Sequence, residues 1–422
     1  MRQPWGRWAW LGALFFFILA AFTGALFRYG AIYGVPWGLH LDNIRHAHSH
    51  LMYFGWVTPA LMAFIAAYVE GRSPRSGMPG FRRVVLAILI LSVFVYIPFL
   101  LYGYKPASVG EARIPFSVIF STLHIFAWYA FVGLYWRHTR GMPRTQALRL
   151  WDAATVFLVV ASLGAWGRAV LAALKVADPF WASAMVHLFL DVFSDGWLVL
   201  GVLGLLHALH DVPDAKAGRV ADGSLYLLWL GVPLAFLLGM PLDFVPPTLR
   251  TLAGIGGVLL SFGFFGQLWI LRDAREWRLP LILLAIDSVA TLGLAFTPVA
   301  RWGESMGLRI LYLHVLLLGF VSLSLWRAAE YVWGGWLVRG RRWFDVSVVV
   351  LLLALIPLTR LWPSMWQGRW AWELVAWLSW GPVLVGTGAL VAGIVRPQGE
   401  VGHMWQRWHV APGQSAGSQA GG

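Results

Sequence analysis

Histidine is the residue type most able to carry chemistry in this chain, because there is no cysteine among its 422 residues. Disulfides, iron–sulfur clusters and thiolate metal sites are therefore excluded. Imidazole remains the strong nitrogen ligand for iron or copper. Half of the 12 histidines lie in apolar stretches, where ionisable residues are uncommon and usually functional. These six are His46, His48, His50, His124, His187 and His314.

The six histidines fall in the outer part of four apolar segments. At 1.5 Å per helical residue, His187 lies roughly 9 Å from Trp181 and His314 roughly 8 Å from the start of its segment, with His124 deeper in its own. A redox metal or haem held between helices is the interpretation that we favour. A proton relay or transport site, and purely structural histidines, are the alternatives.

The spacing of three of these histidines limits how they can act together. His46 and His50 are four residues apart and share one helix face, whereas His48 is displaced by about 200°. Only one face can therefore look at a given partner. Arg45 and Arg309 stand at the outer ends of two of these segments, where cations would suit the propionates of a haem. Plain anchoring at the membrane interface is the alternative for both.

Carboxylates form a second set of candidates. His187, Asp191 and Asp195 recur with helical spacing, so they share one stripe, and Asp287 is another carboxylate in an apolar segment. A carboxylate at membrane depth costs at least ~2.5 kcal/mol, so these side chains should face the protein interior. A proton path, or Asp191 orienting His187, is the functional interpretation, and a polar clamp between helices is the alternative.

The composition sets the context for these groups. Hydrophobic residues make up 59% of the chain and charged residues only 12%, which excludes a soluble globular enzyme. The net charge of +13 does not indicate a nucleic-acid partner, because the bases lie in short runs between apolar stretches. About 20 apolar residues are needed to cross a bilayer as a helix, and twelve windows qualify. They lie near 8–28, 46–69, 84–104, 114–136, 150–173, 181–206, 225–244, 251–271, 279–298, 309–332, 344–360 and 370–395.

These windows predict an all-α, polytopic integral membrane protein of about twelve transmembrane helices. Most of the 32 basic residues flank the windows on the side of the N-terminus, so the positive-inside rule predicts cytoplasmic N- and C-termini in an inner or plasma membrane. Residues 1–395 should form one membrane domain with six-span halves of about 1–206 and 225–395. Residues 396–422, which end in a Gly/Ser/Ala run, should be a disordered cytoplasmic tail.

A resemblance to a known family rests mainly on the segment His48–Trp56. Its sequence HSHLMYFGW resembles the HxHxMxFG motif of NnrS proteins, which are haem- and copper-containing membrane proteins associated with nitric oxide stress. Two further stretches are similar, His187 followed by the run 196–201, and His314 followed by Gly319. The placement of histidines in spans two, six and ten also resembles that in the catalytic subunit of haem–copper oxidases and nitric oxide reductases. Those enzymes hold copper with a His pair in span seven, and residues 225–244 here contain no histidine.

The resemblance and the shared depth lead to one working hypothesis. A b-type haem is expected between span two, through His48 or His50, and His314 of span ten, with copper at a second site involving His187 and His124. An oxidoreductase that handles electrons or a gas such as nitric oxide would follow, with an electron donor and the lipid bilayer as partners. A proton-coupled secondary transporter that uses Asp191, Asp195 and Asp287 is the rival hypothesis.

Overall fold

The computed structural model describes residues 5–72, 79–210, 214–334, 338–395 and 408. It is 86% helical, which confirms the predicted all-α class. Within these ranges, eleven helices are long and apolar enough to cross a membrane. The protein is therefore a multi-pass membrane protein.

One predicted span, near 344–360, is not among the eleven. The chain is helical there, as α15 (Val338–Leu355) and the short 3₁₀ segment η9 (Ile356–Leu358). Its first two turns carry three arginines and Asp345, which leaves fewer than the roughly 20 apolar residues that a span needs.

The chain divides into two compact units. Unit 1 consists of Met1–Pro143, Leu325–Ser347 and Trp372–Gly422, and unit 2 of Arg144–Ser324 and Val348–Ala371. These units reflect packing, whereas the predicted six-span halves follow chain order and stay a prediction. The predicted tail lies outside the described residues except for Trp408, whose buried ring lies 5.4 Å from that of Tyr68.

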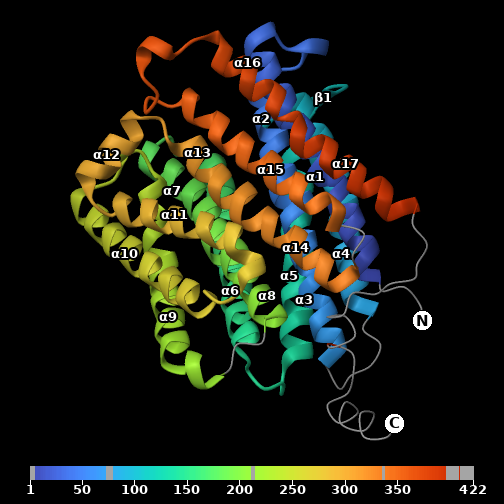
Figure 1. The fold of residues 1–422 in the computed structure, drawn as a ribbon. Helices are drawn as coiled ribbons and strands as arrows, with labels where there is room; N and C mark the ends of the chain where they lie inside the picture. The colour runs from blue at the N-terminus through green and yellow to red at the C-terminus, as the bar shows by residue number, and fades with distance from the viewer. Residues whose placement is uncertain (1–4, 73–78, 211–213, 335–337, 396–407, 409–422) are drawn as a thin grey trace, which may run out of the picture. The chain divides into compact units, whose positions relative to one another are not determined.

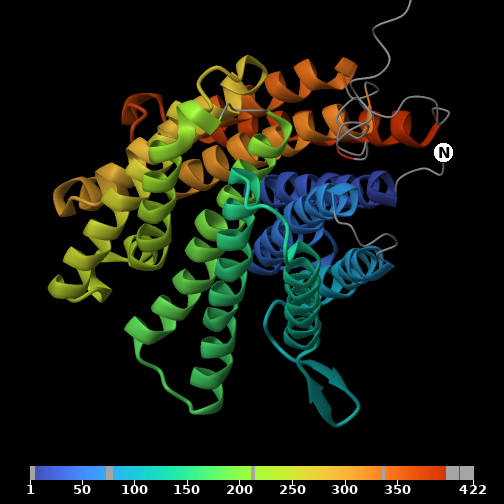
Figure 2. The same ribbon diagram turned by 90° about the horizontal axis from the view of Figure 1, so that it is seen from below.

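Unit 1 is built around one continuous helical rod, in which every residue from 53 to 69 is buried. A two-stranded antiparallel hairpin joins α4 to α5 (Figure 2). The elements of unit 1 are α1 (Trp5–Tyr33), η1 (Pro36–Gly38), α2 (Leu41–His50), η2 (Leu51–Val57), α3 (Thr58–Arg72), α4 (Pro79–Tyr102), β1 (Ala107–Val109), β2 (Ala112–Ile114), α5 (Phe116–Thr139) and α17 (Trp380–Val395). Three helices contribute to both units, namely α14 (Leu323–Trp333), α15 and α16 (Arg369–Leu378).

Unit 2 has a similar central rod, in which Asp195 is the one residue between 192 and 206 that is not fully buried. Its elements are α6 (Gln146–Ala173), α7 (Pro179–Asp191), η3 (Val192–Val199), α8 (Leu200–Leu209), α9 (Asp214–Ala235), η4 (Phe236–Gly239), η5 (Leu242–Phe244), α10 (Pro247–Ile270), η6 (Arg275–Trp277), α11 (Arg278–Leu294), α12 (Thr297–Ser305), α13 (Arg309–His314), η7 (Val315–Ser322), η9 and η10 (Ser364–Trp366).

Local sequence signals explain where the helices of unit 2 begin and how closely they pack. The Asp178 carboxylate accepts the backbone N–H of Phe180 (2.8 Å) at the start of α7, directly before Pro179 in the first turn. Helices α9 and α10 run side by side (Figure 1). A Cβ on Gly231 of α9 would lie 2.5 Å from the backbone nitrogen of Leu260 on α10. Because glycine has no side chain, the backbones of α9 and α10 can approach closely, as is common between membrane helices.

The three segments η2, η3 and η7 are π-helices, each inserted in the middle of a long α-helical rod. They follow directly after His50, Asp191 and His314, respectively. Because π-turns are rare and frequently occur at functional sites, these three positions direct attention to the side chains beside them.

Candidate functional site

His48 of α2 points toward α1 within unit 1. Its Nδ1 donates a hydrogen bond to the carbonyl oxygen of Ala20 (2.8 Å). Gly24 lies one turn further along α1, and a Cβ at that position would be 2.9 Å from Cε1 of His48. The glycine therefore makes room for the imidazole against the backbone of α1.

The other two histidines of α2 point in a different direction. The ring of His50 stacks on Phe99 of α4, with centroids 3.7 Å apart, and its Nε2 accepts a hydrogen bond from the Tyr104 hydroxyl (3.2 Å). The ring of His46 also packs on Tyr104, with centroids 4.9 Å apart. The prediction that His46 and His50 share a face opposite His48 is confirmed.

His124 of α5 lies deeper in unit 1 and is completely buried. Its ring stacks on Phe54 with centroids 5.1 Å apart, and the ring of His50 also packs on Phe54, at 5.3 Å. The hydroxyl of Ser92 lies 3.4 Å from Nε2 of His124. The ring of Phe54 thus lies between the imidazoles of His124 and His50.

In unit 2, His187 and Asp191 form the pair that the helical spacing predicts. Nδ1 of His187 donates to the Asp191 carboxylate (2.8 Å), and His187 is 3% exposed. On the other edge of the ring, Arg309 of α13 donates from Nη2 to Nε2 (3.4 Å). Gly239 closes the pair from the end of η4, where a Cβ would lie 2.5 Å from Nδ1 of His187. The imidazole is therefore held on three sides by one carboxylate, one guanidinium and one glycine.

Asp195 and Asp287 lie next to this pair, in the same unit. The two carboxylates interact electrostatically, and both also interact with the hydroxyl of Tyr312, which is hydrogen-bonded to Thr291 (3.0 Å). Asp287 is 1% exposed, and within the described residues neither of its carboxylate oxygens has a hydrogen-bond partner. The three carboxylates predicted as a proton path, Asp191 included, therefore belong to one polar cluster, in which Asp287 is buried and the other two are half-buried.

His314 and Arg45 complete the predicted set. His314, the last residue of α13, donates from Nδ1 to the carbonyl of Ile310 (2.7 Å). Arg45 forms an exposed ion pair with Asp42 (3.2 Å) one turn away on α2. Its cation is thus already compensated by a carboxylate, while Arg309 is directed at His187.

A glycine occupies the same position in each π-helix. Gly55, Gly196 and Gly319 each stand five residues after the residue that precedes the π-helix. A Cβ at these glycines would meet Phe16 of α1 at 3.0 Å, Phe157 of α6 at 2.5 Å and Leu283 of α11 at 2.8 Å. The glycines therefore allow one neighbouring helix to pack closely against each π-helix.

Nδ1 of His50 also donates to a backbone carbonyl, that of His46 (2.9 Å), so His48, His50 and His314 share one tautomer. A carbonyl oxygen can only accept, so in each neutral ring the proton is on Nδ1 and the lone pair is on Nε2. Histidines that ligate metals usually donate their other ring N–H to a carbonyl or a carboxylate in this way. The rings of His48 and His314 therefore fit the role of haem-iron ligands through Nε2, whereas His50 would have to exchange its hydrogen bond from Tyr104 for the iron.

The second predicted metal site is placed differently. His187 carries the same tautomer, but its Nε2 accepts from Arg309, and a cation there opposes the approach of a metal ion. Within the described ranges, no three His, Asp or Glu side chains form a group that could hold a metal ion. The geometry accordingly fits a copper site less well than a haem ligated by single histidines.

The units divide the predicted residues into two sets. His46, His48, His50, His124 and Arg45 belong to unit 1, and His187, His314, Arg309 and the three Asp residues to unit 2. A haem between span two and span ten, and copper shared by His124 and His187, would each join one unit to the other. Both stay predictions.

Several contributors to these sites were not found in the sequence. The π-helices, Phe99 and Tyr104 beside His50, and Tyr312 beside the carboxylates are examples. The sequence signal that could have indicated the π-helices is the glycine that follows His50, Asp191 and His314 at the same distance of five residues. No protein-family model matches the chain, and no curated protein sequence matches it.

Proposed function

We propose that the protein is a membrane haem protein that handles electrons or a small diatomic gas such as nitric oxide. His314 and one of His48 or His50 would hold a b-type haem by binding its iron through Nε2. The observation that carries the proposal is the Nδ1–carbonyl hydrogen bond of each candidate ring, at 2.8, 2.9 and 2.7 Å. Such a bond fixes the tautomer that an iron ligand requires.

The haem, when bound, would supply an iron centre able to change oxidation state or to take up a diatomic ligand. The residues of the chain would contribute orientation and exclusion of water. Ala20 holds the ring of His48 from α1, and Phe99 and Tyr104 hold that of His50 from the other side. Copper remains a second, less supported cofactor of this proposal, through His124 and His187.

The proposed topology adds α15, with η9, as a twelfth and shorter span to the eleven apolar helices, and places both termini in the cytoplasm of an inner or plasma membrane. The distribution of basic residues supports it. A gas would then reach the histidines from the outer half of the membrane. An electron donor would complete the assembly if the protein acts as an oxidoreductase.

The test is an absorption spectrum with iron analysis of the purified full-length protein. We expect a Soret band that is lost in His314→Ala and in one of His48→Ala and His50→Ala, and that is retained in the control His40→Ala, an exposed histidine outside the helix that carries the candidates. A wild-type protein that contains no iron and shows no Soret band would refute the proposal.

The buried carboxylates favour a second candidate function, a proton-coupled secondary transporter. The supporting observation is Asp287, because both of its carboxylate oxygens are buried and have no hydrogen-bond partner among the described residues. Asp195 is its neighbour. A transporter predicts that Asp287→Asn abolishes proton uptake driven by a pH gradient in proteoliposomes. A pigmented wild-type protein whose spectrum changes on reduction, with no such uptake, would favour the haem protein instead.

A further inference from the structure

A pocket of about 610 Å³ lies in unit 2, in a region that the proposed function does not use. It is formed by the first half of α10, the η5 segment before it, and the junction between α11 and α12. This volume is in the range of ordinary ligand sites. The residues that line it come from elements within one unit, so the pocket is a property of that unit alone.

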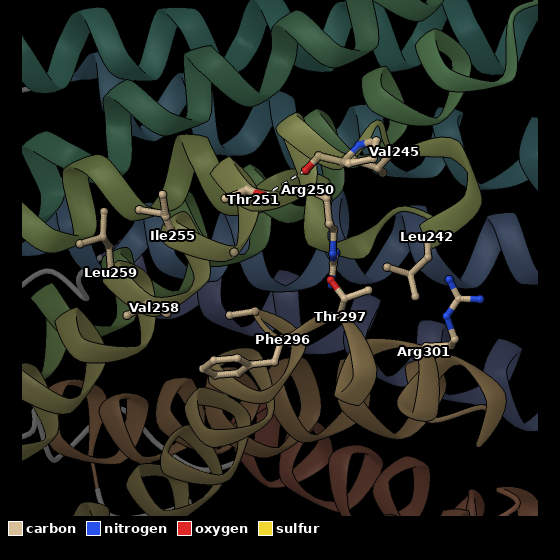
Figure 3. Close-up of a pocket in the computed structure, with 13 residues that line it drawn as sticks. Leu242, Val245, Arg250, Thr251, Ile255, Val258, Leu259, Phe296, Thr297 and Arg301 are labelled. Atoms are coloured by element: carbon tan, nitrogen blue, oxygen red, sulfur yellow. Dashed lines mark hydrogen bonds between the residues drawn. The ribbon is translucent and has the colours of Figure 1, made fainter.

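The pocket has a cationic end and an apolar end (Figure 3). Arg250 and Arg301 line one end, and the side chains of Ile255, Val258 and Leu259 line the other. Phe296 flanks the apolar part from the start of α12. The ligand that fits this division carries an anionic group at one end and a hydrocarbon at the other.

Arg250 is an unusual side chain for a pocket wall, because it is only 6% exposed. Its Nη2 donates to the carbonyl of Leu294 (2.6 Å), which anchors the guanidinium. Nε and Nη1 have no hydrogen-bond partner among the described residues. Glu304 on α12 interacts with Arg250 electrostatically, but no ion pair of Arg250 or Arg301 is found in the described part of unit 2. A buried cation without a paired anion is unfavourable, and an anion bound beside it removes that cost.

The apolar end opens toward lipid rather than toward the protein core. Ile255 is 49% exposed on α10, a helix that is long and apolar enough to span a membrane, and Phe296, just before α12, is 56% exposed. From Arg250 to Leu259, α10 rises about 14 Å, which is close to half of the roughly 30 Å hydrocarbon core. One acyl chain that starts at the arginines could therefore follow α10 through its own leaflet.

We propose that this pocket binds an anionic glycerophospholipid, with the phosphate between Arg250 and Arg301 and one acyl chain along Ile255, Val258 and Leu259. The lipid neutralises the buried guanidinium of Arg250 and covers the apolar wall of α10. The proposal does not depend on the presence of a haem.

The test measures lipid retention by the full-length protein with native mass spectrometry, using phosphatidylglycerol, phosphatidylcholine and glycerol 1-phosphate as probes. We expect phosphatidylglycerol to be retained at least about tenfold better than phosphatidylcholine, because the choline cation of phosphatidylcholine offsets its phosphate and is repelled by the two guanidiniums. Arg250→Gln should remove this preference. The matched control is Arg272→Gln, which removes the same charge at the other end of α10, where the guanidinium lies 4.2 Å from the Trp269 ring and makes no part of the pocket.

Two further variants keep the test decisive if Arg250→Gln does not fold. Arg301→Gln, at the exposed rim, should weaken the preference several-fold, and Ile255→Trp should reduce retention of phosphatidylglycerol by filling the apolar end. Equal retention of the two lipids by the wild type would overturn the proposal, as would an equal loss in Arg250→Gln and Arg272→Gln. Glycerol 1-phosphate bound as tightly as phosphatidylglycerol would show a free-phosphate site, and would overturn the lipid assignment.

Discussion

Replacing Gly239 by alanine should break the hydrogen bond between His187 and Asp191. The added methyl group would lie 2.5 Å from Nδ1 and 2.9 Å from Cε1 of His187, whereas ordinary van der Waals contacts begin at about 3.4 Å. The ring and the carboxylate must therefore move by about 1 Å, and a bond of 2.8 Å cannot survive such a shift with its geometry intact.

The expected magnitude follows from the bond that is lost. A hydrogen bond to a charged group contributes about 1.5–3 kcal/mol, and the lower entropy of the unfolded alanine chain offsets about 0.4–1 kcal/mol of its loss. The net destabilisation is then about 0.5–2.6 kcal/mol. For a unit of this size, that corresponds to a decrease in Tm of about 1–10 °C.

The assay is thermal unfolding of the purified protein, arranged as a double-mutant cycle with Asp191→Ala. If Gly239→Ala acts through the His187–Asp191 pair, its effect should shrink by about 1 kcal/mol or more once Asp191 is absent. The control is Gly223→Ala in α9 of the same unit, where a Cβ would meet nothing within 4 Å, so Tm should stay the same or rise. Strict additivity of the two changes would refute the role assigned to Gly239.

Three further predictions concern the packing and the ion pairs, all measured as changes in thermal stability. Gly231→Ala should destabilise the protein by about 1–3 kcal/mol through overpacking of α9 on the backbone of α10, and an unchanged Tm would show that the two helices are not so close. Arg149→Gln removes a half-exposed partner of Asp222 and should cost at most about 1 kcal/mol. Arg327→Gln leaves Asp345 without the guanidinium that binds it at 2.7 Å, and should cost about 3 kcal/mol or more; equal effects of the two arginine variants would contradict this difference.

Local sequence patterns predicted those parts of the structure that depend on spacing along one helix. Apolar length predicted most of the spans, and the helical period placed His48 opposite His46 and His50 and paired His187 with Asp191. The two side-chain placements follow because a helix fixes the relative direction of residues two to four positions apart.

Contacts between distant segments could not be predicted in this way. Arg309 reaches His187 across 122 residues of sequence, and Asp287 approaches Asp195 from another helix. The expectation that Arg309 serves a haem propionate used its depth alone, and depth does not give the direction of a side chain. The π-helices were also missed, because they differ from α-helices by one residue in the hydrogen-bond spacing, which hydropathy does not resolve.

The π-helices have a consequence for how the three long rods can vary. A π-turn is an α-helix that has gained one residue, so the segments before and after it are rotated by about 100° from their register in an uninterrupted helix. The N-terminal, histidine-bearing half of each rod is therefore aimed independently of the C-terminal half, which is fixed by its own packing. In η2, η3 and η7, the insertion or removal of a single residue, and not a substitution, is the change that would turn His50, Asp191 or His314 toward a different neighbour.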